Sequence, residues 1–433
     1  MTRDTPSPRQ HAGPREFAFS TVAIHTGSHP DPSTNAVIAP IGVSTTFAQS
    51  EIGTSKYEYS RSGNDSRERF ETAVAALEKA KYGLAFSSGS AVTAAILDSL
   101  GSGHIVCGHD VYGGTHRYMT KVANHKGLQT TFANLTNPGV LRGLIQENTK
   151  AVWVESPSNP TLTLVDIAEI ARIAKETNPK IVVVVDNTFN SPYVSNPIAL
   201  GADIVLHSVT KYINGHSDVV MGALVTNSET LYDTLKFLQN ANGAVPSPFD
   251  CFLAHRGLKT LALRARAASD SAFAIAQYLA SSSSVLAVSY PGLKSHPQHQ
   301  LTYKQNRLDA HGHPFSGGMI SFRIKGGAVA AEQFVYSTKL FTLAESLGGV
   351  ESLLEIPARM THAGLTEEER IRAGVYPDLI RLSVGIEDQE DLIWDIQQAL
   401  DKSVPMISVA SMQLKDEPEI DSGIGSEVSS VVY

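Results

Sequence analysis

The chain has 433 residues, of which 42% are hydrophobic and 18% are charged, so its composition is that of a globular protein with room for roughly two or three domains. Its formal net charge of -8 argues against a nucleic-acid partner, which would need a basic face. Its two cysteines indicate neither a disulfide framework nor a thiolate metal site, and they suit a reducing compartment. No apolar run approaches the length of a membrane span, so we expect a soluble, cytoplasmic protein without a membrane partner.

The first 58 residues are predicted to form an N-terminal extension and an arm. Residues 1–16 lack the apolar core of a secretory signal, so we expect a disordered extension rather than a targeting segment. Residues 20–49 are rich in proline and threonine without a helical period, which predicts an extended arm. Tyr59 and Arg61 then stand two residues apart, on the same side of an extended chain. A phosphate could bind both side chains, and a solvated loop explains them equally well.

A short strand, a Ser/Gly turn and a helix of small residues are predicted at 84–86, 87–90 and 91–100, after an amphipathic helix over 68–79. Free backbone N–H groups at a helix N-terminus bind anions, so the turn is a candidate phosphate site. It is not a dinucleotide fingerprint: the nearest candidate, residues 101–106, lacks the third glycine. There is no P-loop either.

Four further apolar runs, at 104–107, 151–154, 181–185 and 202–206, read as buried strands, with helical segments between several of them. This pattern predicts an α/β fold with a mainly parallel sheet. Ligands of such sheets bind at the carboxyl ends of the strands. We therefore expect the polar loops that follow the strands to converge on one edge, and these loops contain Ser87, Tyr112, Asn159, Asp186 and Ser208.

Lys211 and Asp186 are the candidate chemical groups at this edge. Lys211 follows a strand by a few residues, and Asp186 ends the neighbouring run. A lysine here can anchor charge, act as a base or form a Schiff base. A buried carboxylate needs a cationic partner, which a protonated pyridine nitrogen provides. An aspartate on that nitrogen and a Schiff-base lysine together make the pyridoxal phosphate arrangement.

Alternatives to this interpretation remain. Asp186 could instead cap the next helix. The Ser208-x-x-Lys211 spacing also matches the nucleophile motif of penicillin-binding hydrolases, although the companion motifs are missing. A zinc site is poorly supported, because His296 and His299 flank a proline in a predicted loop, where we expect them to be solvated. We therefore predict no metal.

The second half of the chain shows a different pattern. Helices are predicted over 231–238 and, as one long element, over 256–277. Alternating residues at 320–325 and 379–385 predict half-exposed strands, and Asp388 precedes a helix with an apolar stripe of Leu392, Ile396 and Leu400. We predict a smaller α+β domain over 263–402, after a cofactor domain over 59–262 and the arm over 1–58, with a disordered acidic tail over 403–433.

Several of these motifs together resemble the Cys/Met-metabolism family of pyridoxal-phosphate enzymes. The resemblance covers about residues 20 to 402, and it implies a fold-type-I, aspartate-aminotransferase-like enzyme. Asn64-Asp65-Ser66 departs from the Asn-Pro-Thr usual in the family. The matching blocks are Tyr112-Gly113-Gly114-Thr115, Glu155 to Pro160, Asp186, Ser208 to Met221, Ala244 to Pro248, Pro291 to Pro297 and Phe341 to Glu351.

The resemblance implies the following cofactor contacts. Lys211 would hold pyridoxal 5'-phosphate as a Schiff base and later act as the base, and Asp186 would pair with the ring N–H. Tyr112 would stack on the ring, and Asn159 would contact its phenolic oxygen or the substrate carboxylate. Tyr59 and Arg61 would reach the phosphate from a neighbouring subunit of a homotetramer. The phosphate contacts within the chain would be Gly89, Ser90, Ser208 and Thr210.

The resemblance also implies the substrate contacts and the activity. Arg381 would clamp the substrate carboxylate, and Glu345 would recognise a distal amino group. Gly114 replaces the cysteine that methionine γ-lyases carry. The implied reaction is γ-elimination of L-cystathionine to cysteine, 2-oxobutanoate and ammonia, with γ-replacement on an O-acylhomoserine as the alternative and β-elimination as a third. The implied substrate-binding set is Tyr59, Arg61, Tyr112, Arg117, Asn159, Glu345, Ser346 and Arg381.

Overall fold

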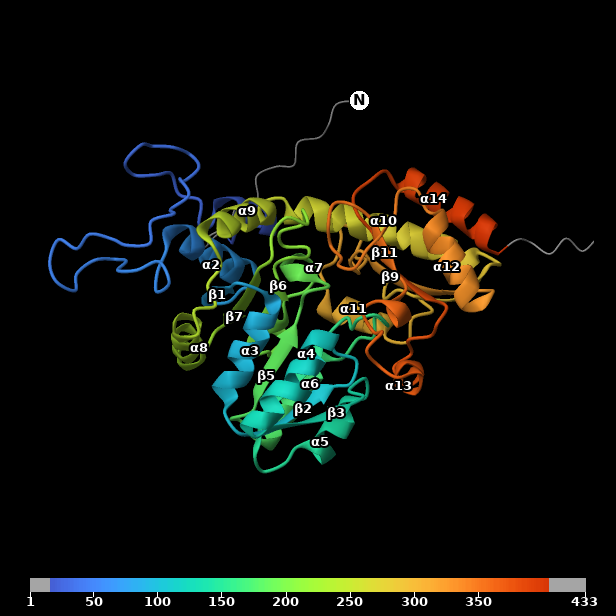
Figure 1. The fold of residues 1–433 in the computed structure, drawn as a ribbon, viewed down its shortest axis with the longest axis horizontal. Coiled ribbons are helices and arrows are strands. Elements are labelled where there is room, and N and C mark those ends of the chain that lie inside the picture. Colours follow the sequence, from blue (N-terminus) through green and yellow to red (C-terminus); the bar gives the residue numbers. More distant parts are fainter. Residues whose placement is uncertain (1–15, 405–433) are drawn as a thin grey trace, which may run out of the picture.

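The computed structural model describes residues 16–404, which form two sheets with their covering helices (Figure 1). The predicted disordered extension before residue 16 and the predicted acidic tail beyond residue 404 lie outside the described residues. The long helix α10 (Leu261–Ser281) runs along one side of the molecule and contacts both parts. Within residues 16–404, no helix is both long enough and apolar enough to cross a membrane.

The larger sheet, within the described part of the chain, has seven strands in the order β1-β7-β6-β5-β4-β2-β3. All pairs are parallel except those of β7, which is antiparallel to both β1 and β6. The predicted mainly parallel sheet is therefore confirmed. The strands are β1 (Tyr82–Phe86), β2 (Gly103–Gly108), β3 (Leu128–Ala133), β4 (Thr149–Glu155), β5 (Val182–Asp186), β6 (Ile204–Ser208) and β7 (Gly222–Thr226).

Helices cover both faces of this sheet because successive strand residues point to opposite sides. Val183 and Val185 of β5 pack into one core, whereas Val184 between them packs into the other. The first core includes α2 (Asp65–Leu77), α6 (Ile167–Thr177), α9 (Pro248–Leu258) and the start of α10, and the second includes α3 (Gly89–Leu100) and α8 (Glu229–Ala241). Burial on both faces explains the continuous β-branched run in the sequence.

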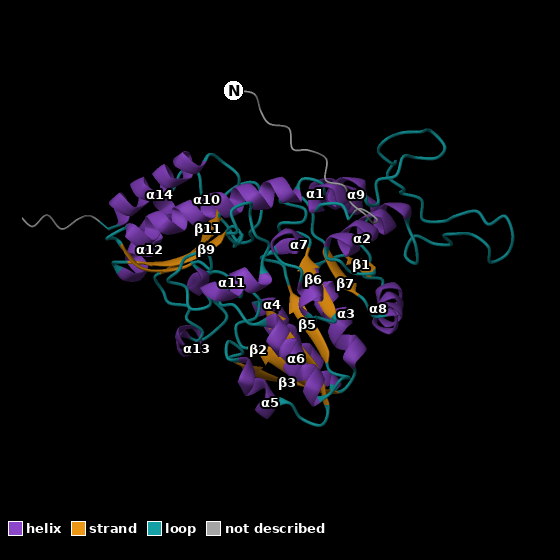
Figure 2. Ribbon diagram, turned by 180° about the vertical axis from the view of Figure 1, so that it is seen from behind, coloured by secondary structure: helices purple, strands orange, loops and turns teal. Residues whose placement is uncertain are grey.

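The smaller sheet has the order β10-β11-β12-β9-β8 among the residues described, and α10, α12 (Gly327–Ser337) and α14 (Gln389–Ser403) pack on one face (Figure 2). Asp388 caps α14 as predicted, and its apolar stripe is buried. The predicted combination of a smaller sheet with helices on one face is confirmed. Its strands are β8 (Val285–Ser289), β9 (Met319–Ile324), β10 (Thr342–Leu343), β11 (Leu353–Glu355) and β12 (Leu379–Ser383).

The prediction that β9 and β12 are half-exposed is wrong for β12, which is buried throughout, and only partly right for the strand over 320–325, where Arg323 and Lys325 reach solvent but Ser321 is buried. Two buried polar residues face the larger sheet's loops rather than solvent: Ser321 Oγ donates to the carbonyl of Pro160 at 2.5 Å, and Arg381 contacts Asn159. Alternation records which residues are polar, but it does not distinguish solvent from a second domain.

Residues 159–162 are held by three side chains of the smaller domain. Besides Ser321, Ser289 Oγ donates to the carbonyl of Thr161 at 2.6 Å, and His296 Nε2 lies 3.1 Å from the carbonyl of Leu162. His296 and His299 are both buried, so the expectation that they are solvated is wrong. They satisfy loop carbonyls that would otherwise be buried without partners.

Two helix predictions also need correction. The arm is not extended throughout, because α1 (Phe19–His25) occupies its start and packs Phe19 on Tyr193. The single helix predicted over 256–277 is two helices, α9 and α10, that meet at Lys259 and Thr260. The remaining short elements are α4 (Gly113–Tyr118), α5 (Leu141–Leu144), α7 (Ser191–Val194), α11 (His299–Gln305), α13 (Glu367–Arg372), η1 (Met119–Ala123), η2 (Asn124–Lys126), η3 (Pro138–Val140), η4 (Pro197–Leu200) and η5 (Pro357–Arg359).

Candidate active site

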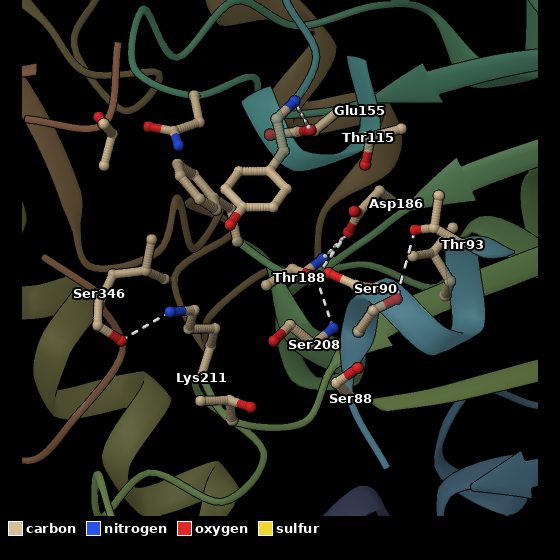
Figure 3. Close-up of a pocket in the computed structure, with 18 of the residues that line it drawn as sticks. Ser88, Ser90, Thr93, Thr115, Glu155, Asp186, Thr188, Ser208, Lys211 and Ser346 are labelled. Carbon is tan, nitrogen blue, oxygen red and sulfur yellow. Dashed lines mark hydrogen bonds between the residues drawn. The ribbon is translucent and has the colours of Figure 1, made fainter. Parts of the chain in front are cut away.

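A cavity of about 260 Å³ lies at the carboxyl edge of the large parallel sheet, closed on its other side by the smaller domain (Figure 3). Loops after β1, β2, β4, β5 and β6 reach it, as the strand-end rule predicts. Most residues singled out from the sequence line it: Gly89, Ser90, Tyr112, Asn159, Asp186, Ser208, Thr210, Lys211, Glu345, Ser346 and Arg381.

One end of the cavity is built to bind an anion. Helix α3 begins at Gly89, and its first N–H groups have no acceptor within the helix. Ser88 caps this helix by accepting the N–H of Ala91 at 3.0 Å. A Cβ on Gly89 would lie 3.2 Å from Cβ of Ser208, so the backbone and that hydroxyl side chain are closely packed. Backbone N–H groups, serine and threonine hydroxyls and the helix dipole together suit a phosphate.

Lys211 points into the centre of the cavity from just beyond β6 (Figure 3). Its Nζ donates to Ser346 Oγ at 2.6 Å. Burial, and next the positive charge of Arg381, lower the pKa of Lys211 from 10.5 to about 8. A substantial fraction of this amine is therefore neutral near pH 7 to 8, which both a nucleophile and a base require.

Asp186 ends β5 and is held by Thr188. Its Oδ1 accepts the backbone N–H of Thr188 at 3.0 Å and the hydroxyl at 2.6 Å. The same hydroxyl oxygen accepts the N–H of Ser208 at 2.9 Å, which ties the ends of β5 and β6 together. Burial raises the pKa of Asp186. The carboxylate does not cap the next helix, because Asn190 is at the N-terminus of α7.

Arg381 enters the cavity from the interior of β12. Its Nη1 donates to Asn159 Oδ1 at 2.8 Å and pairs with Glu355 Oε1 at 3.0 Å, and its Nη2 donates to the carbonyl of Ser346 at 2.7 Å. Thr361 also donates to Glu355 Oε1, at 2.9 Å. Burial raises the pKa of Glu355 and lowers that of Arg381, and their attraction opposes both shifts. The guanidinium is thus fixed and can present N–H groups to a carboxylate.

Ser346 has a backbone conformation that is rare for a residue with a side chain. Its φ is +88°, a region that commonly costs about 1–3 kcal/mol outside glycine. Its hydroxyl accepts from Lys211 while its carbonyl accepts from Arg381. The strained turn therefore connects the amine of one domain to the guanidinium of the other.

Tyr112 and Glu155 form the side of the cavity opposite the phosphate end. The backbone N–H of Tyr112 donates to Glu155 Oε2 at 2.8 Å, and the side chain of Tyr112 lines the cavity. Burial, and next the charge of Asp186, raise the pKa of Glu155. Asp110 accepts Ser158 Oγ at 2.5 Å and so joins the Tyr112 turn to the loop that carries Asn159.

Three predicted residues do not line this cavity. Arg117 lines a neighbouring cavity of about 730 Å³, and Thr361 borders both cavities. Tyr59 and Arg61 lie in the turn that precedes α2 and are not among the residues that line this cavity. Arg61 Nε donates to Asn240 Oδ1 at 3.1 Å, and its guanidinium lies 5.4 Å from the ring of Tyr59. A single chain does not bring these two residues to its own site.

The sequence reasoning missed four polar residues that shape the site: Glu155, Thr188, Glu355 and Thr361. Glu155 and Thr188 immediately adjoin predicted strand ends, so the strand-end rule applied to every polar neighbour would have found both. Glu355 ends a three-residue strand and Thr361 lies in the loop beyond it, and neither has a local sequence signal.

The donor set fits pyridoxal phosphate. The helix N-terminus with its hydroxyls suits the phosphate, the buried carboxylate of Asp186 suits a protonated ring nitrogen, and the partly neutral amine of Lys211 suits the aldehyde. Arg381 on the far side suits the carboxylate of an amino acid.

Comparison with known proteins gives the same picture. A sequence model for the Cys/Met metabolism PLP-dependent enzymes matches residues 20–401. The cystathionine gamma-lyase of Saccharomyces cerevisiae is 61% identical over 391 residues, which are 88% of this chain and 97% of that protein. The crystal structure of cystathionine gamma-lyase from yeast matches with a TM-score of 0.85 and 57% identity, and the match covers 92% of this chain and 100% of that chain.

A structure with a different printed activity is also similar. The cystathionine gamma synthase of Xanthomonas oryzae pv. oryzae, in complex with aminoacrylate and cysteine, matches with a TM-score of 0.86 and 40% identity. That match covers 90% of this chain and 99% of the other. The fold and the pyridoxal-phosphate cofactor predicted from the sequence are confirmed. The chain belongs to the Cys/Met metabolism family of PLP-dependent enzymes.

Proposed function

We propose that the protein is a PLP-dependent carbon–sulfur lyase that eliminates the γ-substituent of L-cystathionine and, with consumption of one water, gives L-cysteine, 2-oxobutanoate and ammonia. The observation that carries this proposal is the pairing of Lys211 and Arg381 through one residue, Ser346, in a single cavity. This geometry suits an enzyme that holds an amino acid by its carboxylate and moves protons beside it. A relative named cystathionine gamma-lyase, 61% identical, supports the choice of substrate.

The cofactor is held by residues of the larger sheet. Gly89, Ser90, Ser208 and Thr210 bind its phosphate, and Asp186 keeps its ring nitrogen protonated. Bound through Lys211, pyridoxal phosphate supplies a ring that accepts electrons from the reacting carbons of an amino acid.

The amine of Lys211 transfers the protons. Beside the bound substrate, the amine of Lys211 would remove the proton at Cα and would then serve the proton movements at Cβ that precede cleavage of the Cγ–S bond. A pKa of about 8 keeps part of the amine neutral for the first of these steps and lets it hold a proton for the later ones. Ser346 Oγ, 2.6 Å from Nζ, keeps the amine on the substrate side of the cavity.

Arg381 and Glu345 fix the substrate at its two ends. The guanidinium binds the α-carboxylate and Asn159 supports it, as their 2.8 Å contact allows. Glu345 lines the same cavity, where a carboxylate attracts the distal ammonium group of cystathionine. Arg117, in the adjoining cavity, is placed to attract the distal carboxylate.

The working unit of this proposal is an oligomer, which we infer to be a homotetramer of site-sharing dimers in the cytoplasm. Tyr59 and Arg61 complete the phosphate site of a second copy, because they do not line the cavity of their own chain, where Arg61 instead contacts Asn240 of α8. The hydroxyl and guanidinium would add a charge-assisted contact at the phosphate.

The test is product analysis after the cofactor-loaded protein is incubated with L-cystathionine. Cysteine with 2-oxobutanoate supports the proposal. Homocysteine with pyruvate would mean β-elimination and would contradict it.

A second candidate is γ-replacement, in which the same residues join cysteine to an O-acylhomoserine. The similar cystathionine gamma synthase structure favours it. Turnover rates measured with each substrate set at matched concentrations decide between the two reactions. A faster rate with O-acylhomoserine and cysteine than with L-cystathionine would favour the synthase.

A further inference from the structure

Helix α2 contacts the Tyr59–Arg61 turn and β1, the strand that leads to Gly89 and Ser90. In the proposed function, Gly89 and Ser90 serve the phosphate of the chain's own site, whereas Tyr59 and Arg61 serve the site of a second copy. Two buried side chains on one face of α2 make these contacts. Arg67 contacts the turn, and Glu71 contacts β1. They stand four residues apart and are therefore neighbours on the helix.

Arg67 holds the Tyr59–Arg61 turn by its backbone. Nη1 donates to the carbonyl of Ser60 and Nη2 to the carbonyl of Arg61, both at 3.0 Å. The side chain is 2% exposed, so these bonds are shielded from water. A planar guanidinium that spans two successive carbonyls fixes the orientation of the turn as well as its position.

Glu71 holds the strand that leads to the phosphate loop. Its Oε1 accepts the N–H of Ala85 in β1 at 2.8 Å and Nε2 of Gln239 at 3.1 Å, and it lies 3.7 Å from Nε of Arg67. Gln239 also donates to the carbonyl of Ala85 at 2.6 Å. Ala85 is four residues before Gly89: Ala85 and Phe86 are buried at the end of β1, and Ser87 and Ser88 connect them to α3.

These contacts form one continuous chain from the turn to the end of β1, the strand that leads to the phosphate loop. A buried charge needs its partner, so loss of Arg67 leaves Glu71 uncompensated, and loss of Glu71 strands Arg67. Asn240, next to Gln239 on α8, binds Arg61 directly and closes the network. The network therefore links the turn to β1 by direct contacts.

We propose that Arg67 is a positioning residue for the cofactor site of the neighbouring subunit, and that Glu71 couples this turn to the phosphate loop of its own subunit. Each chain would thus position phosphate-binding residues of two sites through one ion pair. The proposal rests on the proposed function for the trans role of Tyr59 and Arg61. It adds the residues that fix them and the link between the two sites.

The first test is cofactor affinity, measured by equilibrium dialysis of the apoprotein against pyridoxal phosphate. Arg67→Ala should raise the dissociation constant about tenfold, as expected for losing buried bonds to a charged donor. Arg69→Ala is the matched control, because Arg69 lies on the same helix but pairs with Asp65 at 2.6 Å. If Arg67→Ala does not fold, Arg67→Lys should still weaken binding, since lysine cannot span both carbonyls. Unchanged affinity in the foldable variant would overturn the proposal.

The second test is complementation in mixed oligomers, purified from cells that co-express two differently tagged chains. A Lys211→Ala chain lacks its own amine but presents an intact turn to its neighbour. Paired with an Arg67→Ala chain, it should restore one working site per pair, because that site combines the neighbour's Lys211 with an intact turn. Mixed oligomers no more active than either parent would overturn the trans role of Arg67.

Two further pairings separate the inference from the proposed function. Lys211→Ala with Arg61→Ala tests the shared site alone: if this pair also fails to restore activity, the trans assignment of Arg61 is wrong. If it succeeds while the Arg67→Ala pair fails, only the inference is overturned. Pairing with the Lys211→Ala chain should restore less activity to a Glu71→Gln chain than to an Arg67→Ala chain, because the Glu71→Gln substitution also affects the phosphate loop of its own chain. Equal restoration would contradict the coupling through Glu71.

Discussion

The two sides of the cavity are built in different ways. On the cofactor side, Asp186 and Ser208 end adjacent parallel strands and are joined through Thr188 within that domain, and Lys211 lies three residues beyond the second strand. On the substrate side, Arg381 projects from the interior of a strand, and Ser346 lies in a strained turn.

This difference has a physical consequence. The cofactor side is preformed by regular structure, so it persists as long as the larger sheet does. The substrate side depends on a buried ion pair and on contacts between domains, which are sensitive to small displacements. We therefore expect substitutions on the first side to abolish the chemistry and those on the second to weaken substrate capture.

The largest effect is expected from Lys211→Ala, which removes the only side chain proposed to transfer protons. Turnover of L-cystathionine should fall to background, and the visible absorption of the bound cofactor should shift, because the covalent attachment is lost. Lys259→Ala, at the end of α9 and outside the cavity, is the control. Retained turnover in Lys211→Ala would contradict its role.

Asp186→Asn should leave the cofactor bound but lower kcat by about 10³-fold, because a neutral amide cannot stabilise a protonated ring nitrogen. Steady-state kinetics at saturating cofactor measure this. Asp203→Asn is a matched control: Asp203 accepts a β5 N–H but pairs with Lys175, away from the cavity. Full activity of Asp186→Asn would remove its proposed role.

Arg381→Ala tests the substrate side. It should raise KM and lower kcat/KM, with a loss of transition-state stabilisation of about 2–5 kcal/mol, because it removes the group that binds the substrate carboxylate and leaves the buried Glu355 without its partner. Arg323→Ala is the control, because Arg323 lies opposite Leu379 on the adjoining strand and pairs with Asp378. An unchanged kcat/KM for Arg381→Ala would refute the clamp.

The smallest effect is a shift in the pH dependence of cofactor uptake by the apoprotein. Below the Lys211 pKa of about 8 the amine is protonated and unreactive, so the uptake rate should rise about tenfold per pH unit and level off above pH 8. The positive charge of Arg381 helps to lower this pKa, so Arg381→Ala should move the midpoint upward. A midpoint near 10.5 in the unaltered protein would show that burial does not perturb the amine.

Much of the cofactor side could be predicted from the sequence. The run before Asp186 is continuously apolar, so its strand and its end were identifiable, and the sheet topology brings that end to Lys211. The phosphate turn at Ser88 was predicted for the same reason, since a small-residue helix follows a short strand.

The substrate side was less accessible to sequence reasoning. Arg381 has no local signal beyond alternation, which suggested a solvent-facing residue, and its role came from the family resemblance. Glu355 pairs with it across two strands whose register depends on the whole smaller sheet. The limits of the domains stay a prediction.

The hydrogen bonds that hold residues 159–162 to the smaller domain have a consequence for the design of chimeras between this protein and its relatives. These residues belong in sequence to the larger domain, yet Ser321, Ser289 and His296 of the smaller domain hold three successive carbonyls. A chimera that exchanges only the C-terminal part would pair this loop with foreign side chains and displace Asn159. Crossovers that transfer the loop with the smaller domain would keep both halves of the carboxylate clamp from one parent.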